Sequence, residues 1–277
     1  MTNPFRTALT AVAFGLAALL ALSAPSASAQ EKHTVFTESE FHWQANLKAG
    51  QTLEVIGRNG EVEASGIASG ATEVAGSKSG GNLEEAYIEV VEYPEGATIC
   101  AVYAKDPKPG RCHRGGVNSD EYHGLWHNER AKIRFRATVP RGVLLHAVTT
   151  NGPIHCSSMQ SIVQASTTNG DIHVSTTEWV SASTTNGSVN VTMGSAQWDG
   201  QLHLTSTNGG ITAELPASAQ FILNASTTNG SIHTDFPITV VGDLGGMKHL
   251  SGTVGSGGRD LRLATTNGGI QIHKTAG

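Results

Sequence analysis

The sequence has few charged and few aromatic residues, and it has no excess of basic ones. Of its 277 residues, 15% are charged and 5% are aromatic, and 18 Lys and Arg stand against 23 Asp and Glu. A nucleic-acid partner is not expected, because phosphate binding requires clustered basic side chains. Beyond the first 30 residues, no apolar run approaches the ~18 residues of a membrane-spanning helix. We therefore expect a soluble protein without a membrane span.

The one long apolar segment stands at the N-terminus. Arg6 precedes the run AVAFGLAALLAL at 11–22, and the small residues Ala27, Ser28 and Ala29 precede Gln30. This order is typical of a secretory signal peptide that is removed after residue 29. No cysteine stands at the cleavage position, so a lipid anchor is not expected. The sequence predicts export to the periplasm or to the cell exterior.

Cysteine is also scarce, with three residues in the chain. Cys100 and Cys112 flank a segment rich in Pro and Gly, and in an exported protein such a pair predicts a disulfide. Cys156 is left over in a segment of alternating apolar residues, where a free cysteine packs as a small hydrophobic side chain.

Residues 105–130 form a polar excursion, long enough for either a functional or a disordered loop. Together with Cys100 it offers four zinc-ligand types, although the cysteine spacing is wider than in structural zinc motifs. The pattern is C-x11-C-x10-H-x3-H, from Cys100, Cys112, His123 and His127, with His113 close by. If the cysteines form a disulfide, the metal-ligand candidates are reduced to His113, His123 and His127. No cofactor is expected.

Charge divides the mature chain near residue 147. Residues 30–146 contain 16 acidic and 13 basic residues, whereas residues 147–277 contain 7 and 4, together with 20 Thr and 15 Ser. We therefore predict three parts: a signal peptide at 1–29, a charged β-rich region at 30–146, and a region rich in Thr, Asn and Gly at 147–277.

The third part consists of repeats of one octet, typified by TTNGDIHV at 167–174. On each side of the Asn-Gly, apolar and polar residues alternate with a period of two, which is typical of half-buried strands. The inward columns include Val163 and Ala165 before Asn169, and Ile172 and Val174 after it. A degenerate copy is expected at 250–254, and one more copy of the frame lies at 51–66. The repeated asparagines are Asn151, Asn169, Asn186, Asn208, Asn229 and Asn267.

Two architectures fit these repeats. Asn-Gly between alternating strands is a strong hairpin signal, so an antiparallel meander is one reading. The other is an all-β parallel solenoid of about seven coils, which we favour because the same residue type recurs in the same column. Coils stacked ~4.8 Å apart would place like side chains over one another. The asparagines would then form a hydrogen-bonded ladder.

The repeats identify a family resemblance. The TxNGxIxV octets, the lead-in VPRGVLLHAVTTNG at 139–152 and the closing segment at 250–272 are similar to the bacterial DUF4097 family. The resemblance implies an exported β-solenoid of the kind labelled as adhesins. It implies attachment to a surface, and it supplies no catalytic residues.

No motif in the sequence predicts catalysis. The seven acidic residues of 147–277 fall in different columns, whereas glycoside cleavage needs paired carboxylates. We therefore expect a noncatalytic scaffold or a binding module for a glycan or protein surface. The alternative is a metal-dependent or polysaccharide-active enzyme that uses the 105–130 loop. Stacked histidines such as His155 and His173 could share a cation, but a polar outer face is the simpler interpretation. Self-association is expected if the last coil, ending at His273-Lys274-Thr275, leaves an open strand edge.

Overall fold

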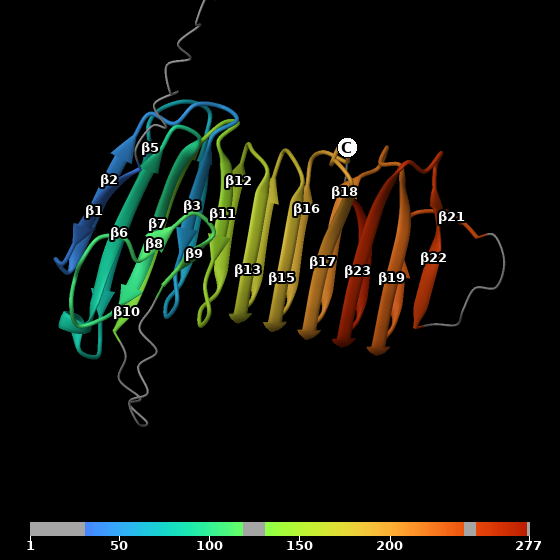
Figure 1. Ribbon diagram of the computed structural model, residues 1–277. Helices are drawn as coiled ribbons and strands as arrows, with labels where there is room; N and C mark the ends of the chain where they lie inside the picture. Colours follow the sequence, from blue (N-terminus) through green and yellow to red (C-terminus); the bar gives the residue numbers. More distant parts are fainter. Residues whose placement is uncertain (1–30, 119–130, 241–247, 276–277) are drawn as a thin grey trace, which may run out of the picture. The chain divides into compact units, whose positions relative to one another are not determined.

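The computed structural model describes residues 31–118, 131–240 and 248–275, and two large β-sheets face each other across one core (Figure 1). The twelve-stranded sheet has the order β1 (Lys32–Phe36), β6 (Ala86–Tyr93), β7 (Gly96–Tyr103), β3 (Thr52–Ile56), β11 (Leu144–Val148), β13 (Val163–Asn169), β15 (Val180–Asn186), β17 (Gln201–Asn208), β23 (Arg259–Asn267), β19 (Phe221–Asn229), β22 (His249–Val254) and β21 (Ile238–Thr239). The ten-stranded sheet has the order β2 (Glu40–Ala45), β5 (Thr72–Ser79), β10 (Lys132–Pro140), β4 (Val62–Ile67), β12 (Ile154–Met159), β14 (Ile172–Thr176), β16 (Val189–Met193), β18 (Ile211–Pro216), β24 (Ile270–Thr275) and β20 (Ile232–Thr234). A short hairpin, β8 (Cys112–His113) and β9 (Gly116–Val117), and a 3₁₀ turn, η1 (Leu83–Glu85), complete the elements.

The repeats form a parallel β-solenoid, which confirms the predicted fold class. Each coil contributes one strand to each sheet, and equivalent strands of neighbouring coils pair in parallel and in register. The predicted inward columns are buried; Val163, Ile172 and Val189 have no exposed surface. Seven coils stack in this way, and the copy at 51–66 supplies the first of them as β3 and β4.

The Asn-Gly corner of each coil is held by two sets of hydrogen bonds. The asparagines form a ladder that starts at Asn151, which accepts from Asn169. Each further asparagine donates its Nδ2 to Oδ1 of the asparagine on the preceding coil of the stack at 2.7–2.8 Å, as far as Asn229. The first Thr or Ser of each motif is buried and donates its hydroxyl to the glycine carbonyl of the neighbouring coil at 2.8–3.0 Å. The motif therefore fastens neighbouring coils as well as turning the chain.

Glycine is required at this corner because the neighbouring backbone lies so close. A Cβ placed on Gly170 would lie 2.1 Å from the carbonyl oxygen of Gly152, and one on Gly268 would lie 2.2 Å from that of Gly209. No side chain fits at such distances, so the glycine column sets how closely the coils approach.

The coils do not stack in sequence order, which corrects the expected succession. Strands β23 and β24, at the C-terminal end of the chain, lie between the coil β17–β18 and the coil β19–β20. The asparagine order is accordingly 151, 169, 186, 208, 267, 229. The expected degenerate copy at 250–254 is not a coil either. It belongs to β22, which pairs antiparallel with β19.

The segment that ends the last repeat in the sequence does not leave an open strand edge. The segment His273-Lys274-Thr275 ends β24, and β24 pairs with β18 on one side and with β20 on the other. The strands at this end of the two sheets are β21 and β20. Self-association through this end remains a prediction, and β20 is now the strand concerned.

Aromatic side chains gather toward the two ends of the core. Phe36 and Phe41 make an edge-to-face contact at 4.8 Å near β1 and β2, and Phe221 and Phe236 make one at 5.4 Å near β19 and β20. Within the described residues, no helix is long or apolar enough to cross a membrane.

Candidate functional site: a polar groove across the ten-stranded sheet

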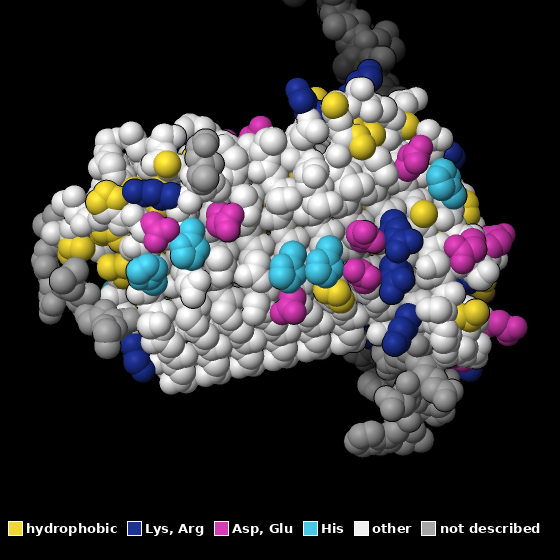
Figure 2. Space-filling view, turned by 180° about the vertical axis from the view of Figure 1, so that it is seen from behind, with side chains coloured by type: hydrophobic (Ala, Val, Ile, Leu, Met, Phe, Trp, Pro, Cys, Tyr) yellow, Lys and Arg dark blue, Asp and Glu magenta, His cyan; other side chains and the backbone are white. Residues whose placement is uncertain are grey.

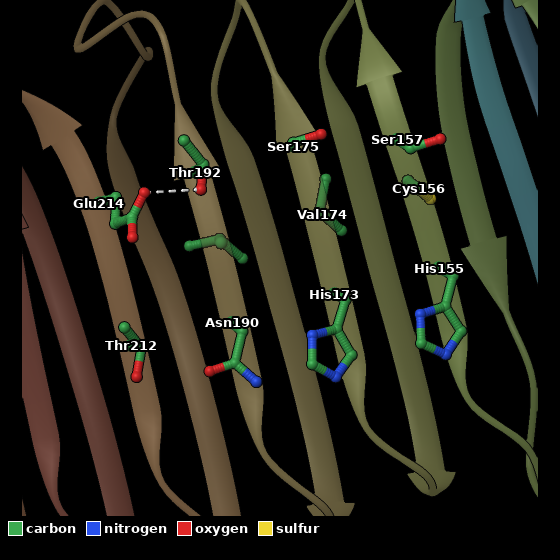
Figure 3. Close-up of a pocket in the computed structure, with 11 residues that line it drawn as sticks. His155, Cys156, Ser157, His173, Val174, Ser175, Asn190, Thr192, Thr212 and Glu214 are labelled. Atoms are coloured by element: carbon green, nitrogen blue, oxygen red, sulfur yellow. Dashed lines mark hydrogen bonds between the residues drawn. The ribbon is translucent and has the colours of Figure 1, made fainter. Parts of the chain in front are cut away.

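A shallow groove of about 410 Å³ crosses the outer face of strands β12, β14, β16 and β18 (Figure 3). Two rows of outward side chains border it. The first row runs from strand to strand in register, whereas the second is in register from β14 to β18 and meets a register shift in β12 after Cys156. One row is His155, His173, Asn190 and Thr212, and the other is Ser157, Ser175, Thr192 and Glu214. Between the rows lie the inward residues Cys156, Val174 and Val191. The groove therefore offers hydroxyl, amide, imidazole and carboxylate groups at strand spacing, ~4.8 Å.

His155 and His173 lie face to face in this groove. Their ring centroids are 5.1 Å apart and the ring planes differ by 4° (Figure 3). Ring nitrogens bind a metal in the plane of the ring, so two stacked, parallel rings do not direct their lone pairs at one ion. The arrangement fits the interpretation of this column as a polar outer face.

The groove has charged residues at both ends, and the space-filling view shows histidines beside acidic and basic side chains on this face (Figure 2). At one end Glu63 is the register neighbour of His155 and accepts a hydrogen bond from Arg136 Nε at 2.9 Å. At the other end Thr192 donates to Glu214 at 3.0 Å. Between these charged groups, Asn190 on β16 and Thr212 on β18 add neutral polar groups to the first row.

A second group of titratable side chains lies beyond Glu214. Asp235 Oδ2 is 3.0 Å from His273 Nδ1, and Asp235 Oδ1 is 3.6 Å from His233 Nε2. The hydrogen bond from His273 lowers the pKa of Asp235 below its ordinary value. Across the described residues, no group of three or more His, Cys, Asp or Glu side chains has the arrangement of a metal site.

Cys156 is the thiol nearest the groove, and it is buried among inward residues. Burial raises the pKa of Cys156 to about 12. Since the thiolate is the nucleophile and the metal ligand, this cysteine is inert at neutral pH.

The described part of the excursion, 105–118, covers the outer face of the twelve-stranded sheet over β3, β6 and β7. Cys100 and Cys112 form a disulfide, and both are fully buried. Glu89, also fully buried, accepts hydrogen bonds from the backbone N–H groups of Gly110, Arg111 and Cys112 at 2.6–3.1 Å. A covalent bond and a buried carboxylate thus fix this segment to β6 and β7.

Glu54 makes a second buried attachment. Its carboxylate accepts hydrogen bonds from Gly115 N–H at 2.7 Å and Thr98 Oγ1 at 2.9 Å, and it lies 2.7 Å from His146 Nδ1. Burial raises the pKa of Glu54. The hydrogen bonds from His146, Gly115 and Thr98 together lower the pKa by more than burial raises it, so the pKa lies below its ordinary value of 4.5.

The lowered pKa predicts a loss of stability in acid. A carboxyl group with a depressed pKa in the folded state binds protons more readily when unfolded, so its contribution is complete above pH 4.5 and is lost as the pH falls through the folded-state pKa. Glu54→Gln should lower the free energy of unfolding by about 1–3 kcal/mol at pH 7 and flatten its decline below pH 4.5. Urea denaturation at pH 7, 4.5 and 3.5 measures both effects. Glu40→Gln, at an exposed position, is the matched control, and an equal change in both variants would contradict the role of Glu54.

The sequence-predicted metal ligands are only partly within the described residues. His113 is exposed and lies 3.2 Å from the carbonyl oxygen of Arg114 and 3.4 Å from Asn118 Oδ1. His123 and His127 lie outside the described residues, as does the expected signal peptide at 1–29. The disulfide leaves neither Cys100 nor Cys112 as a free thiolate for zinc.

Three solved structures of bacterial proteins align over most of this chain. A candidate cell adhesion protein from Clostridium sporogenes ATCC 15579 matches with a TM-score of 0.50 and 11% identity, covering 85% of this chain and 100% of that one. A candidate adhesin from Bacteroides fragilis NCTC 9343 matches with a TM-score of 0.28 and 10% identity, covering 85% and 96%. A candidate lipid-binding protein from Parabacteroides distasonis ATCC 8503 matches with a TM-score of 0.29 and 7% identity, covering 86% and 98%. At 11% identity the likeness to the Clostridium sporogenes protein concerns the fold alone.

No curated protein matches the sequence. The model of one family, described as Toastrack DUF4097, matches residues 22–273. That match spans both sheets and every coil of the solenoid. The chain belongs to the Toastrack DUF4097 family.

Proposed function

We propose that this protein is an exported, noncatalytic, adhesin-like module that binds a glycan through the groove on its ten-stranded sheet. The observation that carries the proposal is the pair of polar rows along that groove, in which Asn190 and Thr212 are neighbouring neutral groups. Hydroxyl and amide groups donate and accept hydrogen bonds, as sugar hydroxyls do. Because the rows repeat from coil to coil, several sugar units can be contacted at once.

Weak contacts of this kind gain strength through repetition. A rigid solenoid holds equivalent groups at fixed spacing, so the second and later contacts form within one complex. The groove is open and shallow, which suits a chain lying across the strands better than a small molecule enclosed in a cavity.

Export and an adhesive role rest on further support. The N-terminal segment has the pattern of a secretory signal peptide, and the disulfide is of the kind that persists in oxidising compartments. The description of the Clostridium sporogenes protein as a candidate for cell adhesion agrees with attachment as the role. We extend that role to this chain as part of the proposal.

A glycan array tests the proposal. The purified protein should bind a subset of glycans, and the double variant N190A/T212A should bind the same glycans about tenfold more weakly, because two groove hydrogen bonds are lost. The matched control is Q164A/S181A, which removes polar groups from the outer face of the twelve-stranded sheet. An array without bound glycans, or equal losses in the two double variants, would contradict the proposal.

A further inference from the structure

A second pocket, of about 420 Å³, lies at the opposite edge of the solenoid from the asparagine corner. Three connections meet there, at 194–200, 217–220 and 255–258, and each leads into a strand of the twelve-stranded sheet. In Figure 1 this is the upper edge, where β17, β19 and β23 begin. The pocket exists because β23 is inserted between β17 and β19, which brings connections distant in sequence side by side.

Arg259 is the only charged residue among the pocket's lining residues. Its Nε donates to the carbonyl oxygen of Trp198 at 2.6 Å. Trp198 is fully buried, and its indole N–H donates to the carbonyl oxygen of Asp260 at 3.0 Å. Nε of Arg259 is therefore held by the backbone of a buried tryptophan whose own position is fixed.

The rest of the guanidinium has no partner within the described part of the chain. Nε makes its one hydrogen bond there, and no described carboxylate lies within ion-pair distance of Arg259. A guanidinium that serves only to stabilise the fold is normally paired with a carboxylate or with several carbonyl oxygens. Here the terminal N–H groups remain available to a ligand.

The remaining lining carries no charge, and four of its side chains are polar. Ser195, Gln197, Ser218 and Gln220 contribute hydroxyl and amide groups, and Gln220 accepts a hydrogen bond from Ser256 that orients its amide. A planar guanidinium binds a carboxylate through two parallel hydrogen bonds, and the neutral groups match the hydroxyls of a sugar ring. A volume of about 420 Å³ is within the range of small-ligand sites.

From this arrangement we propose that the Arg259 pocket binds the carboxylate of an acidic sugar, such as a uronic acid unit of a polysaccharide. The site is separate from the groove on the ten-stranded sheet, and it does not depend on that groove binding a glycan. It assigns Arg259 as the residue that selects a negatively charged sugar.

Calorimetric titration with tri-galacturonate tests this site. The wild-type protein should bind tri-galacturonate and should bind its methyl ester at least tenfold more weakly, because the ester removes the negative charge. Arg259→Gln should lose about tenfold or more in affinity for tri-galacturonate. Arg262→Gln, an exposed arginine on the same strand, removes the same charge and should bind like the wild type.

Because Arg259 also contacts Trp198, its variant could lose stability, so each variant is checked by thermal unfolding. Ser218→Trp, at an exposed lining position, fills the pocket without changing Arg259 and should also abolish binding. Unchanged affinity in Arg259→Gln or Ser218→Trp would overturn the proposal. It would equally be overturned if acetate or a glutamate-containing peptide bound as tightly as tri-galacturonate.

Discussion

Replacing Val189 by aspartate should leave the protein without a cooperative unfolding transition. Val189 is fully buried on β16, and its neighbours in register are Ile172 and Ile211. An ionised carboxylate at this position would have no partner in an apolar column, at a cost of several kcal/mol. That cost is comparable with the net stability of a folded protein, about 5–15 kcal/mol. Circular dichroism during thermal unfolding measures the outcome.

The matched control is Asn190→Asp, one residue further along the same strand. Asn190 points outward into the groove, so the same charge would be hydrated there. This variant should keep the wild-type melting temperature to within a few degrees. If Val189→Asp melted like Asn190→Asp, the assignment of inward and outward columns would be wrong.

The second large effect is expected at adjacent glycines of one corner. A Cβ on Gly268 would lie 2.2 Å from the carbonyl oxygen of Gly209, whereas a Cβ on Gly269 would lie 3.4 Å from that of Ser231, an ordinary contact. Gly268→Ala should therefore force neighbouring coils apart and cost about 3 kcal/mol or more, above the usual cost of an overpacked core. Gly269→Ala should change the free energy of unfolding by less than about 1 kcal/mol. Urea denaturation of both variants is the measurement, and equal stabilities would show that the coil spacing is not set by this glycine.

The solenoid could be predicted from the sequence because the same residue types recur in the same columns. Ile154, Ile172, Val189, Ile211 and Ile270 all lie three residues after an asparagine, and all are buried. A hairpin meander would not require such strict repetition. The column pattern therefore fixed both the direction of pairing and the register.

The order of the coils could not be predicted, for a physical reason. Neighbouring repeats present nearly identical interfaces, so the Asn267 to Asn208 hydrogen bond, at 2.7 Å, is equivalent to the Asn229 to Asn267 bond, at 2.8 Å. The repeat of apolar columns predicts that coils pair, but it does not predict which two coils are neighbours. The order of the coils depends on non-repeating segments such as β22. This strand pairs antiparallel with one edge of β19, and β23 pairs with the other edge of β19.

Some residues of the candidate sites could be predicted from the sequence, and others could not. The row that contains His155 and His173 follows from the outward column and could be predicted. Glu54 and Glu89 could not, because in sequence they belong to alternating strands and are buried only by the excursion that covers them. Arg259 was missed because its pocket is formed by connections, which carry no periodic signal.

The internal position of β23 and β24 has a consequence for biosynthesis. These strands follow β17–β20 in the sequence, yet they fill a level between the coil β17–β18 and the coil β19–β20. The stack therefore cannot grow coil by coil in the order of the sequence, and the coil β19–β20 reaches its place only after β23 and β24 have been made.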